Sequence, residues 1–214
     1  MKNVKWSVPQ LEAFSTCPLQ YYRTRVACDV EPVATEAAQS SQDFIESFSR
    51  ALLDGKVPKK VERFAPFIEM LRGLPGVASI NTTLSVDEHL KPCTLDKAWV
   101  KSKVNYIKST PTHALLFSWR MGAREPSDAL KLSAALYFCL NQGCVSLQVQ
   151  TVWFRARKID REQFTRADLP KLLATFVPTY QRYRTAYETN EWKPQPCGLC
   201  RKYCNVKDCK YNGV

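Results

Sequence analysis

The sequence lacks a long apolar run, an internal repeat and a low-complexity segment. No stretch of its 214 residues approaches the roughly 20 apolar residues that a membrane-spanning helix needs, so we expect no membrane partner. The N-terminus also lacks the apolar core of a signal peptide, and we expect a cytoplasmic protein. Histidine is scarce as well: there are only two, His89 and His113, and both are expected to be surface residues at the ends of strands.

Apolar residues make up 45% of the chain and aromatic residues 11%, which indicates a globular protein with a sizeable core. The formal net charge is +11, and Lys and Arg are spread over the whole chain rather than gathered in a tail. A charge of this size favours a polyanionic partner, usually nucleic acid, over the alternative of a merely solubilising surface.

Hydrophobic periodicity predicts five helices and four strands. The helices are expected over 10–28, broken near Pro18, and over 36–53, 60–72, 128–140 and 169–188; the strands are expected over 77–87, 98–108, 113–119 and 145–156. Ser127 and Asp128 are candidate caps for the helix that follows them. This order of elements predicts an α/β fold with a mixed sheet.

Nine cysteines are many for a reducing compartment, where clustered thiols more often bind metal than form disulfides. Cys139 and Cys144 flank the end of an apolar helix and are expected to be ordinary buried thiols. The tail holds four more within thirteen residues: Cys197, Cys200, Cys204 and Cys209. Taken alone, this spacing fits a zinc knuckle of four local thiols or a reduced, frayed tail.

Two motifs together resemble a known family. The first is Phe14-x-x-Cys17-Pro18-x-x-Tyr21-Tyr22; the second, in the tail, comprises Pro196, Leu199, Cys200, Tyr203, Cys204, Val206 and Cys209, with Asn205 in place of the usual proline. The pair resembles the iron–sulfur branch of the PD-(D/E)XK nucleases, which includes RecB-like, AddB-like and Cas4-like nucleases, and is most similar to exonuclease-like proteins of tailed bacteriophages. A phage-encoded chain would work in the host cytoplasm.

The resemblance implies a restriction-endonuclease-like α/β core, a mixed sheet flanked by helices, with a cysteine-liganded cluster that joins the tail to the N-terminal helix. The implied ligands are Cys17, Cys200, Cys204 and Cys209, with Cys197 as the alternate. The implied cofactor is an iron–sulfur cluster, 4Fe-4S, with zinc as the alternative. We expect one nuclease-like domain over 1–214, with a helical N-terminal segment over 1–75, an α/β core over 76–190 and a metal-binding tail over 191–214.

The catalytic positions that the resemblance implies are degenerate. In the family, carboxylates hold Mg²⁺ and a lysine lies beside the scissile phosphate. Here Asn81, Asn105 and Ser118 stand where acids are expected, Arg120 replaces the lysine, Gln42 replaces a histidine and Lys131 replaces a glutamine; Ser102 replaces a glycine. Neutral side chains are poor ligands for Mg²⁺, and we expect no catalytic Mg²⁺ and no hydrolysis.

Arginine and lysine side chains alone can bind DNA phosphates. The candidates are Lys101, Lys103, Arg120, Arg124, Lys131, Arg155, Arg157 and Lys158, with Tyr106 and Trp119 as candidates for stacking on bases. For Trp119, a core position is the alternative.

Three functions follow as hypotheses. The first is a catalytically inactive, nuclease-like protein that binds DNA in replication, recombination or genome protection. The second is an interaction protein that binds a host defence or repair protein, or a phage protein. The third is an active exonuclease whose acids have moved to positions such as Asp87, Glu88, Asp96, Glu125 or Asp128.

Overall fold

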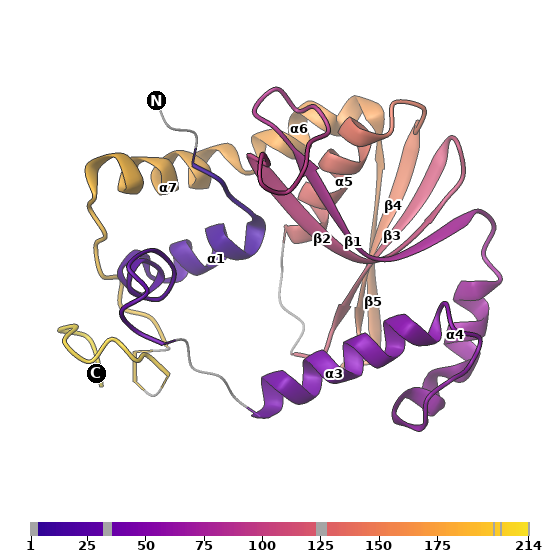
Figure 1. Ribbon diagram of the computed structural model, residues 1–214, viewed down its shortest axis with the longest axis horizontal. Coiled ribbons are helices and arrows are strands. Elements are labelled where there is room, and N and C mark those ends of the chain that lie inside the picture. The colour runs from indigo at the N-terminus through magenta and orange to yellow at the C-terminus, as the bar shows by residue number, and fades with distance from the viewer. Residues whose placement is uncertain (1–3, 32–35, 123–127, 199, 202, 214) are drawn as a thin grey trace. The chain divides into compact units, whose positions relative to one another are not determined.

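In the computed structural model, the chain forms two compact units (Figure 1). The sheet unit is Glu36–Leu173, and the terminal unit combines Met1–Thr35 with Ala174–Val214. The structure describes residues 4–31, 36–122, 128–198, 200–201 and 203–213. Along the sequence, the helices between residues 36 and 72 belong with the sheet, and the last helix belongs with the N-terminal helices.

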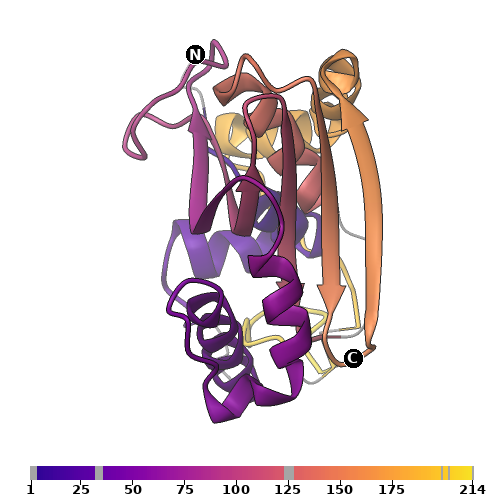
Figure 2. The same cartoon turned by 90° about the vertical axis from the view of Figure 1, so that its right-hand side faces the viewer.

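A mixed sheet flanked by helices forms the centre of the sheet unit, as predicted, but it has five strands rather than four (Figure 2). Its strands are β1 (Val77–Val86), β2 (Val100–Ser109), β3 (His113–Arg120), β4 (Ser146–Trp153) and β5 (Lys158–Thr165), in the order β1-β2-β3-β4-β5. Only β3 and β4 are parallel, and α5 (Ala129–Leu140) connects them. Parallel neighbours need such a crossover, whereas the antiparallel pairs are joined by shorter turns and loops.

Helices cover both faces of this sheet. On one face, Phe117 and Trp119 of β3 pack in an aromatic core with Phe44 and Phe48 of α3 (Glu36–Ala51) and with Ile68 of α4 (Ala65–Arg72). On the other face, the hydroxyl of Ser102 in β2 lies 2.8 Å from the hydroxyl of Ser133 in α5. Figure 2 shows α3 and α4 on one side of the sheet and α5 on the other.

Strand β1 changes face at Asn81. Ile80 lies opposite Tyr106 and packs against the aromatic core, whereas Leu84 lies opposite Ser102, which faces α5. Residues an even number apart normally share a face of a strand, so the alternation breaks in both strands, at the level of Asn81 and Asn105. Asn81 has a φ of 48°, a left-handed conformation that breaks the alternation within β1.

Strand β5 was not predicted from the sequence. Residues 158–165 contain few apolar side chains, and most of them are exposed because β5 is an edge strand. A polar edge strand does not show the alternation that marks a half-buried one.

The predicted helix over 169–188 is two helices, α6 (Leu169–Ala174) and α7 (Val177–Thr189), after the 3₁₀ turn η3 (Arg166–Asp168). Likewise, the helix predicted over 60–72 begins as the 3₁₀ segment η2 (Lys59–Phe64).

The expected cap of α5 also differs. Ser127 lies outside the described residues, and the carboxylate of Asp128 makes no capping hydrogen bond. It forms an ion pair with Lys131 instead, at 2.8 Å.

In the terminal unit, α1 (Val8–Thr16), α2 (Pro18–Tyr21) and the π-helical turn η1 (Tyr22–Val26) pack with α7. The break near Pro18 occurs as predicted, at Cys17. Phe14 packs edge-on against Tyr183 at 5.4 Å, and the hydroxyls of Tyr21 and Tyr183 lie 2.8 Å apart. Burial raises the pKa of Tyr21 to about 12. These aromatic contacts join the two ends of the chain.

Within the described residues, no helix has the length and apolar character needed to cross a membrane.

Candidate functional site

Three of the degenerate catalytic positions lie side by side in the sheet. Asn81 and Asn105 occupy the register position between the pairs Ile80–Tyr106 and Thr82–Val104 of β1 and β2. Asn105 and Ser118 stand one residue beyond the last pair of β2 and β3, Tyr106–Phe117. Asn81, Asn105 and Ser118 therefore form a row across β1, β2 and β3, which we call the polar row.

The side chain of Asn105 has a structural partner. Its amide oxygen accepts a hydrogen bond from the backbone N–H of Trp119 at 2.9 Å. The ladder between β2 and β3 ends at the preceding pair, so this side chain satisfies an N–H group that a strand partner would otherwise take. This bond occupies one of the two acceptor lone pairs of the amide oxygen.

The row continues through two residues that the sequence analysis did not select. Ser118 lies beside Thr151 of β4, and Thr151 lies opposite Asp160 of β5. Asp160 is half-buried and accepts a hydrogen bond from the indole Nε1–H of Trp153 at 2.8 Å. Sequence reasoning missed this carboxylate because it missed β5; an acidic residue between the apolar Ile159 and Phe164 was the signal available.

The remaining degenerate positions lie around the row with partners of their own. Arg120 is half-buried beside Trp153 of β4, and its carbonyl accepts from the N–H of Phe154 at 3.0 Å. Lys131 of α5 is held by Asp128, and this hydrogen bond raises the pKa of the Lys131 ammonium.

Gln42 is exposed on α3, and it is Ser49, two helical turns later, that contacts β3. The hydroxyl of Ser49 accepts from the indole Nε1–H of Trp119 at 3.2 Å.

The carboxylates considered as relocated acids have local partners. Asp87 accepts hydrogen bonds from the backbone N–H groups of Lys91 and His89, both at 2.9 Å, and these bonds lower the pKa of its carboxyl. Glu88 lies 3.6 Å from the imidazole of His89. Glu125 lies outside the described residues. Across the stretches of chain that the structure describes, no group of three or more His, Cys, Asp or Glu side chains is placed to hold a metal ion.

The structure separates the basic candidates into two groups. Lys101 and Lys103 are exposed on the segment of β2 that pairs with Ser85 and Thr83 of β1. Three others surround the turn between β4 and β5, and all are exposed: Arg155, Arg157 and Lys158. Arg124 lies outside the described residues.

Tyr106 and Trp119 do not stack on bases, and that prediction was wrong. Their exposed fractions are 0% and 2%, and both lie in the aromatic core between the sheet and α3. The Tyr106 hydroxyl donates to the carbonyl of Leu71 at 3.2 Å. Both histidines are exposed, as predicted.

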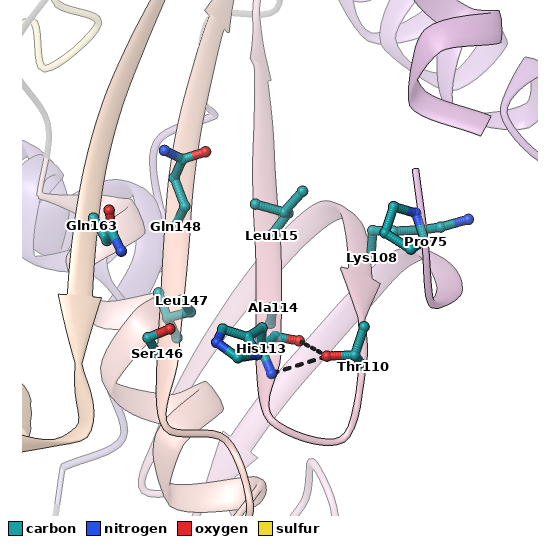
Figure 3. Close-up of a pocket in the computed structure, with 10 residues that line it drawn as sticks. All are labelled: Pro75, Lys108, Thr110, His113, Ala114, Leu115, Ser146, Leu147, Gln148 and Gln163. Carbon is teal, nitrogen blue, oxygen red and sulfur yellow. Dashed lines mark hydrogen bonds between the residues drawn. The ribbon is translucent and has the colours of Figure 1, made fainter. Parts of the chain in front are cut away.

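A pocket of about 300 Å³ opens at the end of the sheet where β3 and β4 begin (Figure 3). Its polar groups are largely engaged within the protein. Lys108, 9% exposed, donates from Nζ to the carbonyl of Arg72, and the Thr110 hydroxyl accepts from the N–H of His113 at 3.1 Å. None of the predicted site residues lines this pocket.

The cysteines of the expected metal centre belong to the terminal unit. Cys17, between α1 and α2, is 6% exposed and Cys200 is 7% exposed, while Cys204 and Cys209 are half-buried. A second link joins η1 to the tail: the Arg23 guanidinium forms an ion pair with Asp208 at 2.9 Å.

The pair at metal-binding distance is Cys197 and Cys200. Their sulfur atoms lie 4.0 Å apart, and the backbone N–H of Cys197 lies 3.3 Å from the sulfur of Cys200. Two thiolates on one tetrahedral zinc lie about 3.8 Å apart, given Zn–S bonds of about 2.3 Å. The distance between the Cys197 and Cys200 sulfur atoms is close to this value. Cys139 and Cys144 are buried as expected, and burial raises the pKa of each thiol.

The fold is similar to that of a candidate exonuclease from Eubacterium rectale, with a TM-score of 0.55 and 13% sequence identity over 97% of this chain and 89% of that chain. The crystal structure of SSO0001 aligns over 99% of this chain and 88% of its own with a TM-score of 0.43 and 10% identity. The sequence matches no protein-family model, and a search of the curated proteins finds no match. The first likeness shows a nuclease-like fold: a mixed five-stranded sheet flanked by helices.

Proposed function

We propose that this chain is a catalytically inactive, nuclease-like protein that binds DNA. The observation that carries the proposal is the polar row: Asn81, Asn105 and Ser118 lie side by side on the strands of a nuclease-like sheet, and none of them carries a negative charge. Two-metal hydrolysis of a phosphodiester needs oxygens with charge to hold Mg²⁺. The resemblance to tailed-phage exonucleases suggests a role in replication, recombination or genome protection.

Two further features argue against hydrolysis. The amide oxygen of Asn105 is engaged by the backbone N–H of Trp119, and Arg120 cannot act as a neutral base because its guanidinium stays protonated. The nearest carboxylate in the same register, Asp160, is held by the indole of Trp153.

Affinity for DNA rests on charge. The net charge of +11 resides in the folded body, and five basic candidates on β2 and on the β4–β5 turn are exposed: Lys101, Lys103, Arg155, Arg157 and Lys158. Side chains of this kind neutralise phosphates and release counterions, which gives binding with little dependence on sequence.

The test combines an electrophoretic shift with a nuclease assay, in Mg²⁺ and in Mn²⁺. We expect DNA to be shifted at about 50 mM salt, the shift to weaken steeply as salt rises, and the DNA to stay intact. The variant Lys101→Gln/Lys103→Gln should reduce the salt slope by about two, while Lys56→Gln/Lys59→Gln, which removes two charges at exposed positions of the same unit, serves as the charge-matched control.

Each alternative predicts a different result. Absence of any shift at about 50 mM salt would overturn DNA binding and favour an interaction protein. Metal-dependent degradation that is abolished by Asp87→Asn or Asp96→Asn, but not by Arg120→Gln, would instead establish relocated acids.

We also propose that the terminal unit holds an iron–sulfur cluster, 4Fe-4S, with zinc as the alternative metal. Cys17, Cys200, Cys204 and Cys209 would hold it according to the resemblance, and the Cys197–Cys200 spacing supports Cys197 as the alternate ligand. Bound there, the metal would order a tail whose described residues bury little beyond Cys200 and Val206.

A further inference from the structure

A second pocket, of about 180 Å³, lies between the β4–β5 hairpin and the segment that leads into α4. Phe64 and Phe67 contribute from η2 and α4, Phe154 and Ile159 from the hairpin, and Arg157 and Lys158 from its turn. We call it the aromatic pocket. All its residues belong to the sheet unit.

The walls of this pocket are aromatic and partly open to solvent. Phe64 packs against Phe154 with ring centroids 5.0 Å apart, and Phe48 supports Phe154 from behind at 4.8 Å. Phe64 and Phe67 are only half-buried, and Ile159 is 37% exposed. Folding therefore leaves apolar faces uncovered here, beside a rigid aromatic core.

The rim of the pocket is positively charged. Arg157 and Lys158 line it, Arg155 stands two residues before Arg157, and the Arg63 guanidinium lies 4.8 Å from the centre of the Phe64 ring. Among the described residues, neither Arg157 nor Lys158 forms an ion pair with a carboxylate. An occupant that matches both the walls and the rim is flat and apolar at its centre and anionic at its flanks.

The backbone of Arg157 supports a role for its side chain. Its φ is 52°, the left-handed region that glycine adopts without a steric penalty. A non-glycine residue there costs about 1 kcal/mol. Arginine thus occupies a turn position at which glycine would be the stable choice, and strained positions of this kind concentrate at functional sites.

We propose that the aromatic pocket stacks one unpaired base of a single-stranded DNA, with the flanking phosphates bound by Arg157 and Lys158. The proposal rests on the proposed DNA binding and specifies the form of DNA. At about 180 Å³ the pocket is smaller than the roughly 300 Å³ at which pockets for whole drug-sized ligands begin, so it suits one ring system. A base paired within a duplex cannot enter, because both of its faces are stacked.

The experiment measures fluorescence anisotropy at about 50 mM salt with three probes: an oligothymidine of about 20 nucleotides, an abasic strand of the same length, and a duplex. Wild type should bind the oligothymidine more tightly than the abasic strand. Phe67→Leu keeps the apolar bulk and removes the aromatic face, and we expect about a fivefold or greater loss of affinity for the oligothymidine alone.

A second variant covers the case in which Phe67→Leu disturbs the fold. Ile159→Asp places a charge in the pocket from an exposed position, and Gln163→Asp adds the same charge to an exposed position on the same strand, outside the aromatic pocket. The first should lower affinity for the oligothymidine several-fold more than the second, with equal effects on the duplex.

The outcomes separate the two proposals. If wild type binds none of the probes, the proposed function fails and the pocket proposal fails with it. If wild type binds the abasic strand as tightly as the oligothymidine, and Ile159→Asp matches Gln163→Asp, DNA binding stands and base stacking is overturned. That result would favour an apolar side chain of a partner protein as the occupant of the aromatic pocket.

Discussion

Asn105 carries no charge and has a structural partner. The nuclease resemblance expects a metal-binding aspartate at its position in the polar row, and its oxygen accepts a hydrogen bond from the N–H of Trp119 where β2 and β3 separate. An aspartate would offer the same acceptor. Asparagine therefore keeps this hydrogen bond without the negative charge that a Mg²⁺ ligand would supply.

This arrangement predicts different effects for two substitutions. Asn105→Ala leaves a partly buried N–H without a partner and should lower the free energy of unfolding by roughly 1–2 kcal/mol. Asn105→Asp keeps the acceptor and should stay within about 0.5 kcal/mol of wild type near neutral pH. Urea denaturation of both variants measures the difference. Equal free energies of unfolding for the alanine and aspartate variants would show that the hydrogen bond to Trp119 does not stabilise the fold.

Prediction from sequence at the level of single residues fails for the faces of the strands. The positions of Asn81, Asn105 and Ser118 came from the family resemblance, and in the structure they lie at one level of neighbouring strands. The burial of Tyr106 and Trp119 did not follow, because alternation along a strand shows that two faces exist but not which helix covers each. The break of alternation at Asn81 has no sequence signal beyond an asparagine, which tolerates positive φ.

At the scale of elements, the junction between β5 and α6 shows why an edge strand escapes detection and how its end is marked. Thr165 and Asp168 form a capping box at η3: the Asp168 carboxylate accepts from the Thr165 N–H at 2.8 Å and from its hydroxyl at 2.9 Å. Such a box is readable in the sequence as Thr-x-x-Asp, and it marks where a preceding segment must stop. The helix was predicted from Leu169-Pro170 and the aromatic residues after it instead, and the strand before it was not predicted.

The capping box predicts a pH dependence. Its hydrogen bonds lower the pKa of Asp168, so the folded state favours the carboxylate. The stabilisation is therefore present above the unfolded pKa, about 3.9, and is lost as the pH falls through the lower folded value. Asp168→Ala should be less stable than wild type at pH 7, and the gap should close below about pH 4.

Thermal melts of both proteins from pH 7 to pH 3 measure this gap, and Asp168→Asn, which keeps a neutral acceptor, is the control. A gap that stays constant as the pH falls would contradict a role for the charged carboxylate.

At the scale of the whole molecule, the terminal unit brings Cys17 together with the tail in one compact unit. The tail taken alone suggested a local zinc knuckle, and the long-range link came from a resemblance rather than from periodicity or charge. Elements far apart in sequence meet through tertiary packing, here the aromatic contacts of α1 and α2 with α7, which no local pattern encodes.

The proposed metal centre gives a prediction at this scale. Protein purified without oxygen should be brown, and Cys17→Ser should lose the metal and melt well below wild type, because metal binding supplies folding free energy of order 10 kcal/mol in structural sites. Cys28→Ser, an exposed cysteine of the same unit, is the matched control and should keep both. Metal analysis, the visible spectrum and thermal melts report the result.

A colourless protein with stoichiometric zinc would exclude the iron–sulfur cluster. A Cys17→Ser protein with unchanged metal content and melting temperature would exclude Cys17 as a long-range ligand.

The composition of the terminal unit also sets an order of assembly on the ribosome. The chain emerges from the N-terminus and domains tend to fold as units during synthesis, so Glu36–Leu173 is complete before the last segment exists. Residues 4–31 can therefore pack against α7 and the cysteine tail only after the whole sheet unit has been synthesised. A nascent chain at that stage therefore carries a finished sheet and an unfinished terminal unit, and it can bind the proposed metal only after the cysteines over 197–209 have been synthesised.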